Sequence, residues 1–338
     1  MSPDHSLPAA TPFHRMATLR PAWAGRLRPL LTLAAAFIAY VVLISVVLVL
    51  TILVLALAPG VNVAIGITSG DPTSPLDVAL ALAMGVMWLP AGSIGVRFGG
   101  WRPLGTAWSV TARPRRALLR SLGPWGVAMG AVVVAAAALA GAITRADGGS
   151  AGSAAGGADS AGSVPQLLLV ALIVLVLGPL QAIGVELTLR GVVLQTLGTW
   201  LRSPLPAMIA ASAVMLIGRE LSLAVVLPAL ALGLASAVLA WKSGGLELSI
   251  LLVTTVTVTS HLVSALGAGT GAGSGAAALN AAAAAPGTSS AALATAAAGP
   301  AALAGGLTAT VTLLLLTAVM MGRISARERV GLREPVAR

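Results

Sequence analysis

Long apolar segments, separated by short polar or basic ones, dominate this chain. Each approaches or exceeds the roughly 20 residues that a helix needs to cross the hydrocarbon core of a membrane. The first is uncharged and much longer than the apolar region of a signal peptide, so we interpret it as a retained membrane helix. The pattern predicts eight membrane-spanning helices, at residues 30–58, 76–96, 119–143, 165–189, 205–221, 223–241, 247–266 and 302–322.

Composition agrees with an all-α, polytopic membrane protein. Hydrophobic residues make up 57% of the chain and charged residues only 9%, which leaves too little polar surface for a soluble globular domain. The absence of cysteine excludes disulfides, thiolate metal sites and a cysteine nucleophile. The abundance of Ala, Gly, Val and Arg, with Lys242 as the single lysine, is typical of a bacterial protein.

The distribution of basic residues predicts an orientation in the membrane. With eight helices and a cytoplasmic N-terminus, every Lys and Arg except Arg145 and Arg219 falls on the cytoplasmic side, as the enrichment of basic residues in cytoplasmic loops requires. The formal net charge of +10 therefore indicates membrane topology and not nucleic-acid binding. We expect a multi-pass protein of the cytoplasmic (plasma) membrane with both termini in the cytoplasm.

Two segments, 144–164 and 267–301, consist mainly of Gly, Ala and Ser. Such segments bury too little apolar surface to order themselves, so we expect flexible loops. The other segments are a basic N-terminal region, the first three membrane helices, a core, the last helix and a basic tail, at residues 1–29, 30–143, 165–266, 302–322 and 323–338.

Residues 181–200 contain the candidate site. Glu186 and Arg190 follow an uncharged apolar span, and Gly191 comes next. An ionisable side chain at the end of such a span is costly and commonly marks a functional site. The i, i+4 spacing places Glu186 and Arg190 on one helical face, where an ion pair is expected. The alternative is a purely structural pair that holds the helix end.

This stretch resembles the first motif, E-E-x-x-x-R-G, of the CPBP intramembrane metalloproteases, which include CAAX prenyl protease 2 and lysostaphin-resistance-protein-A-like enzymes. Here the motif begins with Val185 in place of the first glutamate and continues with Glu186, Arg190 and Gly191. The resemblance extends over about residues 165–260.

Two further motifs of the family fit with substitutions. The second, F-x-x-x-H, aligns Met215 with the aromatic residue and Arg219 with the histidine. In the third, Val253 and Thr257 replace a histidine and an asparagine. The framework of the third motif is retained at Gly233, Lys242, Gly244 and Leu246.

The resemblance implies the fold of an intramembrane endopeptidase without its chemistry. In active members the residue at the position of Val185 activates the attacking water, and histidines bind the metal. The chain has three histidines, of which His5 and His14 are N-terminal and His261 lies two helical turns beyond Val253. We therefore expect no zinc and no other cofactor, with Glu186 and Arg190 as remnants of the catalytic motif.

Arg219 and His261 each have more than one interpretation. Arg219 lies either at the membrane interface beside Glu220, or with its guanidinium in the place of the metal, where it neutralises Glu186. His261 belongs to a threonine-rich segment and is expected to hydrogen-bond a neighbouring helix.

The resulting functional prediction is an inactive homologue that binds membrane-embedded or lipidated peptides. Its partners are the lipid bilayer and such a peptide or membrane protein. One alternative is an active protease with substituted ligands such as Glu186, Glu220 and His261. Another is a transporter or a scaffold subunit of a membrane complex, although the internal repeat or paired broken helices typical of transporters are not evident.

Overall fold

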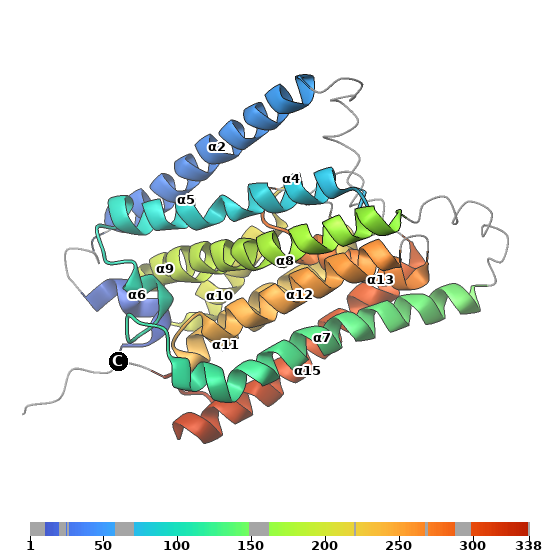
Figure 1. Cartoon of the computed structure of the whole chain (residues 1–338). Helices are drawn as coiled ribbons and strands as arrows, with labels where there is room; N and C mark the ends of the chain where they lie inside the picture. Colours follow the sequence, from blue (N-terminus) through green and yellow to red (C-terminus); the bar gives the residue numbers. More distant parts are fainter. Residues whose placement is uncertain are drawn as a thin grey trace, which may run out of the picture.

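The computed structural model describes residues 11–19, 25, 27–57, 71–148, 162–219, 221–267, 270–287 and 299–336. Within these ranges the only regular secondary structure is helical, apart from isolated bridge residues such as the pair Ser109 and Gly245. Seven of the described helices are long and apolar enough to cross a membrane. Figure 1 shows them side by side, and the chain is an all-α polytopic membrane protein.

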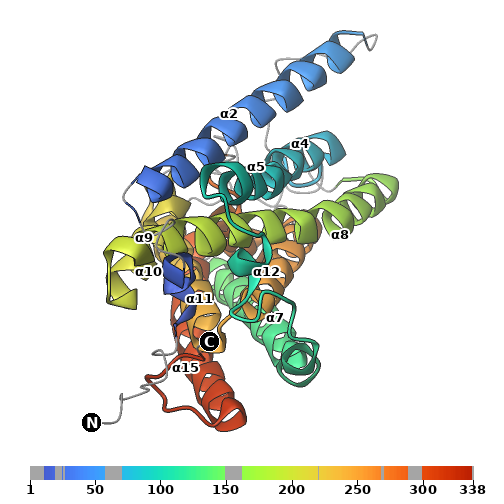
Figure 2. The same ribbon diagram turned by 90° about the vertical axis from the view of Figure 1, so that its left-hand side faces the viewer.

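The N-terminal half of the bundle contains three long helical segments. α2 lies at one edge of the bundle and leans away from the other helices toward its C-terminal end (Figures 1 and 2). One short helix, α6, lies between the second and third segments. The bounds are η1 (Phe13–Leu19), α2 (Leu27–Ala56), α4 (Pro75–Val86), α5 (Trp88–Ile94), η2 (Gly95–Gly99), α6 (Gly105–Trp108) and α7 (Arg116–Asp147).

The C-terminal half supplies the centre of the bundle and the edge opposite α2. In Figure 2, α8, α11 and α12 lie between α2 on one side and α7 and α15 on the other. The bounds are α8 (Val164–Glu186), η4 (Leu187–Leu194), α9 (Gln195–Trp200), α10 (Pro204–Ala213), η5 (Val214–Leu216), α11 (Leu223–Ser243), α12 (Glu247–Leu266), α13 (Gly271–Ala283) and α15 (Pro300–Glu328).

The predicted membrane span at residues 205–221 is wrong as a spanning helix. The chain there forms only α10 and the 3₁₀ turn η5, together about 20 Å long against about 30 Å of hydrocarbon. Gly218 then adopts a φ of 75°, a conformation that favours glycine and ends the helical path. The other seven predicted spans coincide with the seven long helical segments.

The expectation of a flexible loop at residues 267–301 is wrong for residues 271–283. α13 is a buried helix that packs against α7, α11, α12 and α15. A Cβ added to Gly275 would lie 2.3 Å from the Ala137 oxygen of α7, and one added to Gly305 of α15 would lie 2.5 Å from Gly275 Cα. Small residues let these three backbones touch. The Gly and Ala content that suggested disorder therefore permits a tight junction of three helices. Most of the other predicted loop, residues 149–161, lies outside the described residues.

The basic N-terminal region is also partly folded. In η1, Phe13 and Met16 are fully buried and join the apolar cluster around α9 and α10. The C-terminal tail returns to the turn between α11 and α12, where Lys242 Nζ donates to the carbonyl oxygens of Gly331 and Glu334. Both terminal regions therefore meet the same end of the bundle.

Candidate functional site

The candidate motif lies where α8 changes from α-helix to π-helix. Glu186 is the last residue of α8, and η4, a π-helix over Leu187–Leu194, contains Arg190 and Gly191. π-Helical turns are rare and frequently occur at functional sites. All residues from Gly184 to Val192 are buried, so the motif is held inside the bundle. The expectation that Arg190 belongs to a cytoplasmic loop is therefore wrong.

Glu186 and Arg190 form the predicted ion pair. Arg190 Nη1 lies 3.1 Å from Glu186 Oε1, and the side chains are 1% and 0% exposed. Arg190 Nη2 also donates to the Gly233 carbonyl oxygen at 2.7 Å and contacts the Ser236 hydroxyl. The pair thus joins η4 to α11.

The surroundings of Glu186 contain no second cation among the described residues. Ser236 and Ser249 lie beside its carboxylate, but their hydroxyls donate to carbonyl oxygens of their own helices, those of Gly233 and Leu246. Arg190 is the single described ion-pair partner of Glu186. The charge of this buried carboxylate is therefore compensated by the arginine four residues away.

Gly191 permits a close helix contact. A Cβ at this position would lie 2.9 Å from the Ala107 carbonyl oxygen, so only glycine lets α6 approach η4. Arg102 donates to the Gly191 oxygen at 3.0 Å and to Gln195 Oε1 at 2.5 Å. The arginine and glycine of the motif therefore have structural roles in this chain.

The substituted positions Val185 and Val253 belong to two adjacent apolar clusters. Val185 packs in a cluster with Met215, Trp88 and Tyr40. Val253 packs in the bundle core, in a cluster that includes Ala182 of α8 and receives Leu216 of η5 at its edge. The three motif segments therefore meet around α8, as the resemblance requires, but the side chains at these two positions are core residues.

Arg219 does not lie in the place of the metal beside Glu186. It is 8% exposed, and its guanidinium donates to the carbonyl oxygens of Met215 and Ala284. Within the described parts of the chain no ion pair joins it to Glu186, so the hypothesis that it neutralises this carboxylate is wrong. Arg219 instead connects η5 to the end of α13. Glu220 lies outside the described residues.

His261 and Thr257 pair within their own helix. His261 Nδ1 lies 2.7 Å from the Thr257 carbonyl oxygen, so the prediction of a hydrogen bond to a neighbouring helix is wrong for this nitrogen. The Thr257 hydroxyl is buried and has no hydrogen-bond partner among the described residues. Neither side chain contacts Glu186 in any described hydrogen bond or ion pair.

The residues present do not fit a zinc ion. A catalytic zinc requires three protein ligands that converge on one point, whereas Val253 is apolar and Arg219 is a cation bound to backbone oxygens. Across the described ranges, no group of three His, Cys, Asp or Glu side chains is placed to hold a metal. We therefore assign no step of any reaction to a metal at this position.

An aromatic pair beside the motif was missed by sequence analysis. The rings of Tyr40 and Trp88 stack with centroids 3.9 Å apart. Tyr40 Oη and Trp88 Nε1 both donate to the Pro286 carbonyl oxygen, at 3.0 and 3.2 Å. Tyr40 is the only tyrosine and lies in the middle of an apolar span, which is a signal in itself, because a hydroxyl at that depth needs a partner.

The pair lines an apolar cavity of about 350 Å³ between α2 and the motif helix. Its wall includes Phe37 and Val41 of α2, Thr188 and Val192 of η4, and Ile217. This volume lies within the usual range for small-molecule sites. Because α2 is almost entirely exposed on its outer side, the cavity lies at the lipid-facing edge of the bundle.

His14, outside the membrane-spanning helices, gives a testable pH dependence. Its Nε2 lies 3.3 Å from the Arg202 carbonyl oxygen, and burial is the main reason that its pKa falls below the ordinary value of 6.5. A base with a lowered folded pKa binds fewer protons when folded, so stability is lost as the pH falls below 6.5. We expect the unfolding midpoint in detergent to drop between pH 7.5 and 5.5 by less in His14→Gln than in the parent. Equal drops would contradict this role.

A known protein family matches the part of the chain that contains the candidate site. Residues 165–259 match the family described as type II CAAX prenyl endopeptidase Rce1-like. No curated protein and no solved structure matches the chain. The matched region runs from the start of α8 into α12 and so contains the ion pair, α10, α11 and all the substituted motif positions. This chain is thus a polytopic membrane protein whose residues 165–259 are similar to the Rce1-like type II CAAX prenyl endopeptidases.

Proposed function

We propose that this protein binds membrane-embedded or lipidated peptides without hydrolysing them. The single observation that carries the proposal is the buried ion pair of Glu186 with Arg190, 3.1 Å apart. In a hydrolase of this family a carboxylate must accept a proton from a metal-bound water. Here the remaining motif carboxylate is neutralised by an arginine four residues away, and the position of the preceding glutamate is held by Val185 in an apolar cluster.

The cavity beside the motif supports a binding role. It is lined almost wholly by apolar side chains, and Thr188, which lies between Glu186 and Arg190 in the sequence, forms part of its wall. The Thr188 hydroxyl donates to the Trp88 carbonyl oxygen at 2.8 Å, which leaves a hydrophobic surface toward the cavity. Such a surface suits a hydrocarbon chain that enters from the bilayer.

The distribution of basic residues supports a proposal for the membrane and the orientation of the protein in it. One end of the bundle gathers several basic residues: Arg115 pairs with Glu247 there, and Arg327 donates to the Ala117 carbonyl oxygen. The enrichment of basic residues in cytoplasmic segments supports this end as the cytoplasmic one. The proposed environment is the cytoplasmic membrane of a bacterium, with both termini in the cytoplasm. Seven long helices are compatible with this because α10, η5 and the turn after them also take the chain from one end of the bundle to the other, from Ala207 in the cluster of η1 to Ala224 beside Gly306 of α15.

Binding of a farnesylated peptide tests the proposal. In nanodiscs we expect a labelled peptide with a farnesylated C-terminal cysteine to bind, and the same peptide without the farnesyl group to bind at least about tenfold more weakly, which corresponds to roughly 1.4 kcal/mol. The mass of the bound peptide is expected to stay unchanged after incubation with Zn²⁺. Cleavage of the peptide, or binding that ignores the farnesyl group, would refute the proposal.

Two tryptophan variants provide the matched control. Val41 lines the cavity and Val42 does not, although both lie on α2 and are at least 41% exposed. Val41→Trp is therefore expected to reduce farnesyl-dependent binding, whereas Val42→Trp leaves it unchanged. Equal behaviour of the two variants would place the peptide elsewhere.

A further inference from the structure

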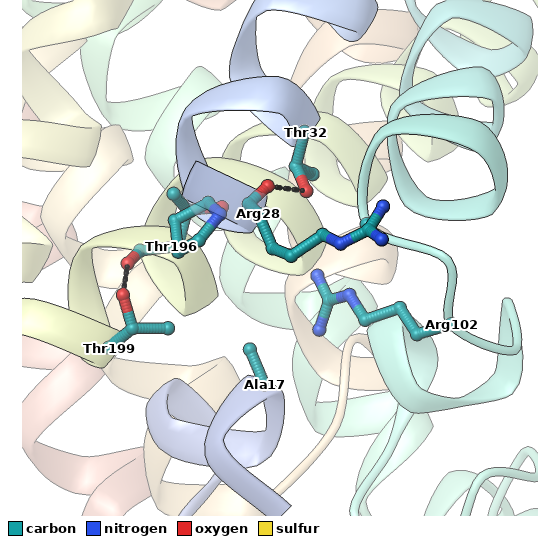
Figure 3. A pocket seen from close by; sticks show the side chains of 8 residues that line it. Ala17, Arg28, Thr32, Arg102, Thr196 and Thr199 are labelled. Carbon is teal, nitrogen blue, oxygen red and sulfur yellow. Dashed lines mark hydrogen bonds between the residues drawn. The ribbon is translucent and has the colours of Figure 1, made fainter. Parts of the chain in front are cut away.

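Two arginines share a small pocket at the basic end of the bundle. Arg28 in the first turn of α2 and Arg102 in the segment after η2 both line it, together with Thr32, Thr196 and Thr199. Figure 3 shows the two guanidinium groups projecting into the same space from different elements. The pocket volume is about 10 Å³, which admits about one oxygen-sized group.

The charges in this pocket are not compensated within the described chain. Arg102 is 2% exposed, and its described hydrogen-bond partners, Gln195 and the Gly191 carbonyl, are neutral. Neither Arg28 nor Arg102 forms an ion pair with a described carboxylate. Burial lowers the pKa of Arg102 to about 10, which leaves it charged at neutral pH. Two neighbouring cations in a half-enclosed site create a strong preference for an anion.

The position of Arg28 adds to this preference. It lies in the first turn of a 30-residue helix, at the positive end of the helix dipole, where anions are favoured and cations are not. Its guanidinium carbon lies 4.9 Å from the ring centroid of the exposed Trp101. Exposed tryptophans are typical of the membrane–water interface, which is the depth of lipid phosphate groups.

The apolar cavity begins one residue beyond the pocket. Thr32 lines the pocket, and Leu33 and Ala36 line the cavity on the same helix. Across from them, Thr196 lines the pocket, and Val192 and Val193 line the cavity. The two spaces therefore follow one another between α2 and the motif helix, with the charged end at the interface and the apolar end in the hydrocarbon.

We infer that these two spaces form a binding site for one anionic phospholipid. The phosphate group accepts hydrogen bonds from Arg28 and Arg102, and one acyl chain lies in the cavity beside Tyr40 and Trp88. Guanidinium groups bind phosphate oxygens through charge-assisted hydrogen bonds, which are stronger than neutral ones. The inference goes beyond peptide binding, because a lipid in this place occupies the cavity until a lipidated peptide displaces it.

Lipid titrations of the purified protein in detergent, read by native mass spectrometry, test the inference. Phosphatidylglycerol and phosphatidylcholine with identical acyl chains are the probes, and no peptide is present. We expect one tightly bound phosphatidylglycerol per chain and weaker phosphatidylcholine binding. Arg28→Gln is expected to weaken phosphatidylglycerol binding about tenfold, as for the loss of one charge-assisted hydrogen bond, and Arg28→Lys to have a smaller effect.

Arg116→Gln is the control, because it removes the same charge from an exposed arginine on α7. Equal lipid affinities of Arg28→Gln and Arg116→Gln would overturn the inference, whatever the outcome for the farnesylated peptide. Displacement of the lipid by an equal concentration of inorganic phosphate would also overturn it, because the ligand would then be the free anion. The acyl-chain position is tested separately by Val41→Trp, which is expected to weaken phosphatidylglycerol binding, whereas Val42→Trp is not.

Discussion

Replacing Arg190 by methionine is expected to lower the free energy of unfolding by about 3–5 kcal/mol, the range for loss of one partner of a buried ion pair. The substitution leaves Glu186 charged at 0% exposure, with no other described cation as its partner. It also removes the hydrogen bond to the Gly233 oxygen that joins η4 to α11. Unfolding by SDS titration in mixed micelles measures the change.

A double variant separates the ion pair from side-chain volume. Arg190→Met combined with Glu186→Gln removes both charges, so most of the lost stability is expected to return, since apolar replacement of a whole buried pair is often neutral. Arg327→Met provides the exposed comparison, because the pair of Arg327 with Glu328 lies at the surface and exposed pairs contribute at most about 1 kcal/mol. If Arg190→Met and Arg327→Met cost the same, the buried pair has no structural role.

Replacing Gly305 by valine is the second large change. A Cβ at this position would lie 2.5 Å from Gly275 Cα and 3.0 Å from the Ala137 oxygen, so α13 and α7 must both move away from α15. Overpacking of this kind commonly costs about 1–3 kcal/mol and occasionally more. We expect a value at or above the upper end, because the obstructing atoms belong to backbone and not to flexible side chains. The free energy of unfolding in mixed micelles is again the measurement.

Gly322→Val is the matched control on the same helix. A Cβ at Gly322 meets nothing within 4 Å, so this variant is expected to keep the parental stability or to gain a few tenths of a kcal/mol from higher helix propensity. Similar losses in both variants would mean that α15 tolerates valine nowhere. Parental stability of Gly305→Val would mean that α13 does not pack against α15 as described.

The long helices were predictable because their signal is local. Uninterrupted apolar segments of membrane length can satisfy their backbone hydrogen bonds in lipid only as helices, and seven of the eight predicted spans are such helices. The failures came from segments whose state depends on neighbours. Residues 271–283 are Gly and Ala rich, and nothing within the segment distinguishes a loop from a helix that α7 and α15 enclose.

The contact between Glu186 and Arg190 was predictable from the sequence, but the partners of the residues around them were not. The spacing of Glu186 and Arg190 fixed their contact, because residues four apart share a helix face. The partner of Arg219 was not predictable, because the Ala284 oxygen reaches it from 65 residues away. The same holds for Tyr40 and Trp88, whose shared acceptor, the Pro286 oxygen, is more than 190 residues away from both.

Residue order alone was enough to predict a helical membrane protein, its ion pair of Glu186 with Arg190 and the positions at which the CPBP motifs are replaced. These properties depend on composition, helical periodicity and residue identity, all of which act over a few turns of chain. Tertiary structure decided the burial of α13, the anchoring of Arg219 and the adjacency of the cavity to the Arg28 and Arg102 pocket. Each of these depends on backbone groups from distant segments meeting at close range, and neither composition nor periodicity encodes such meetings.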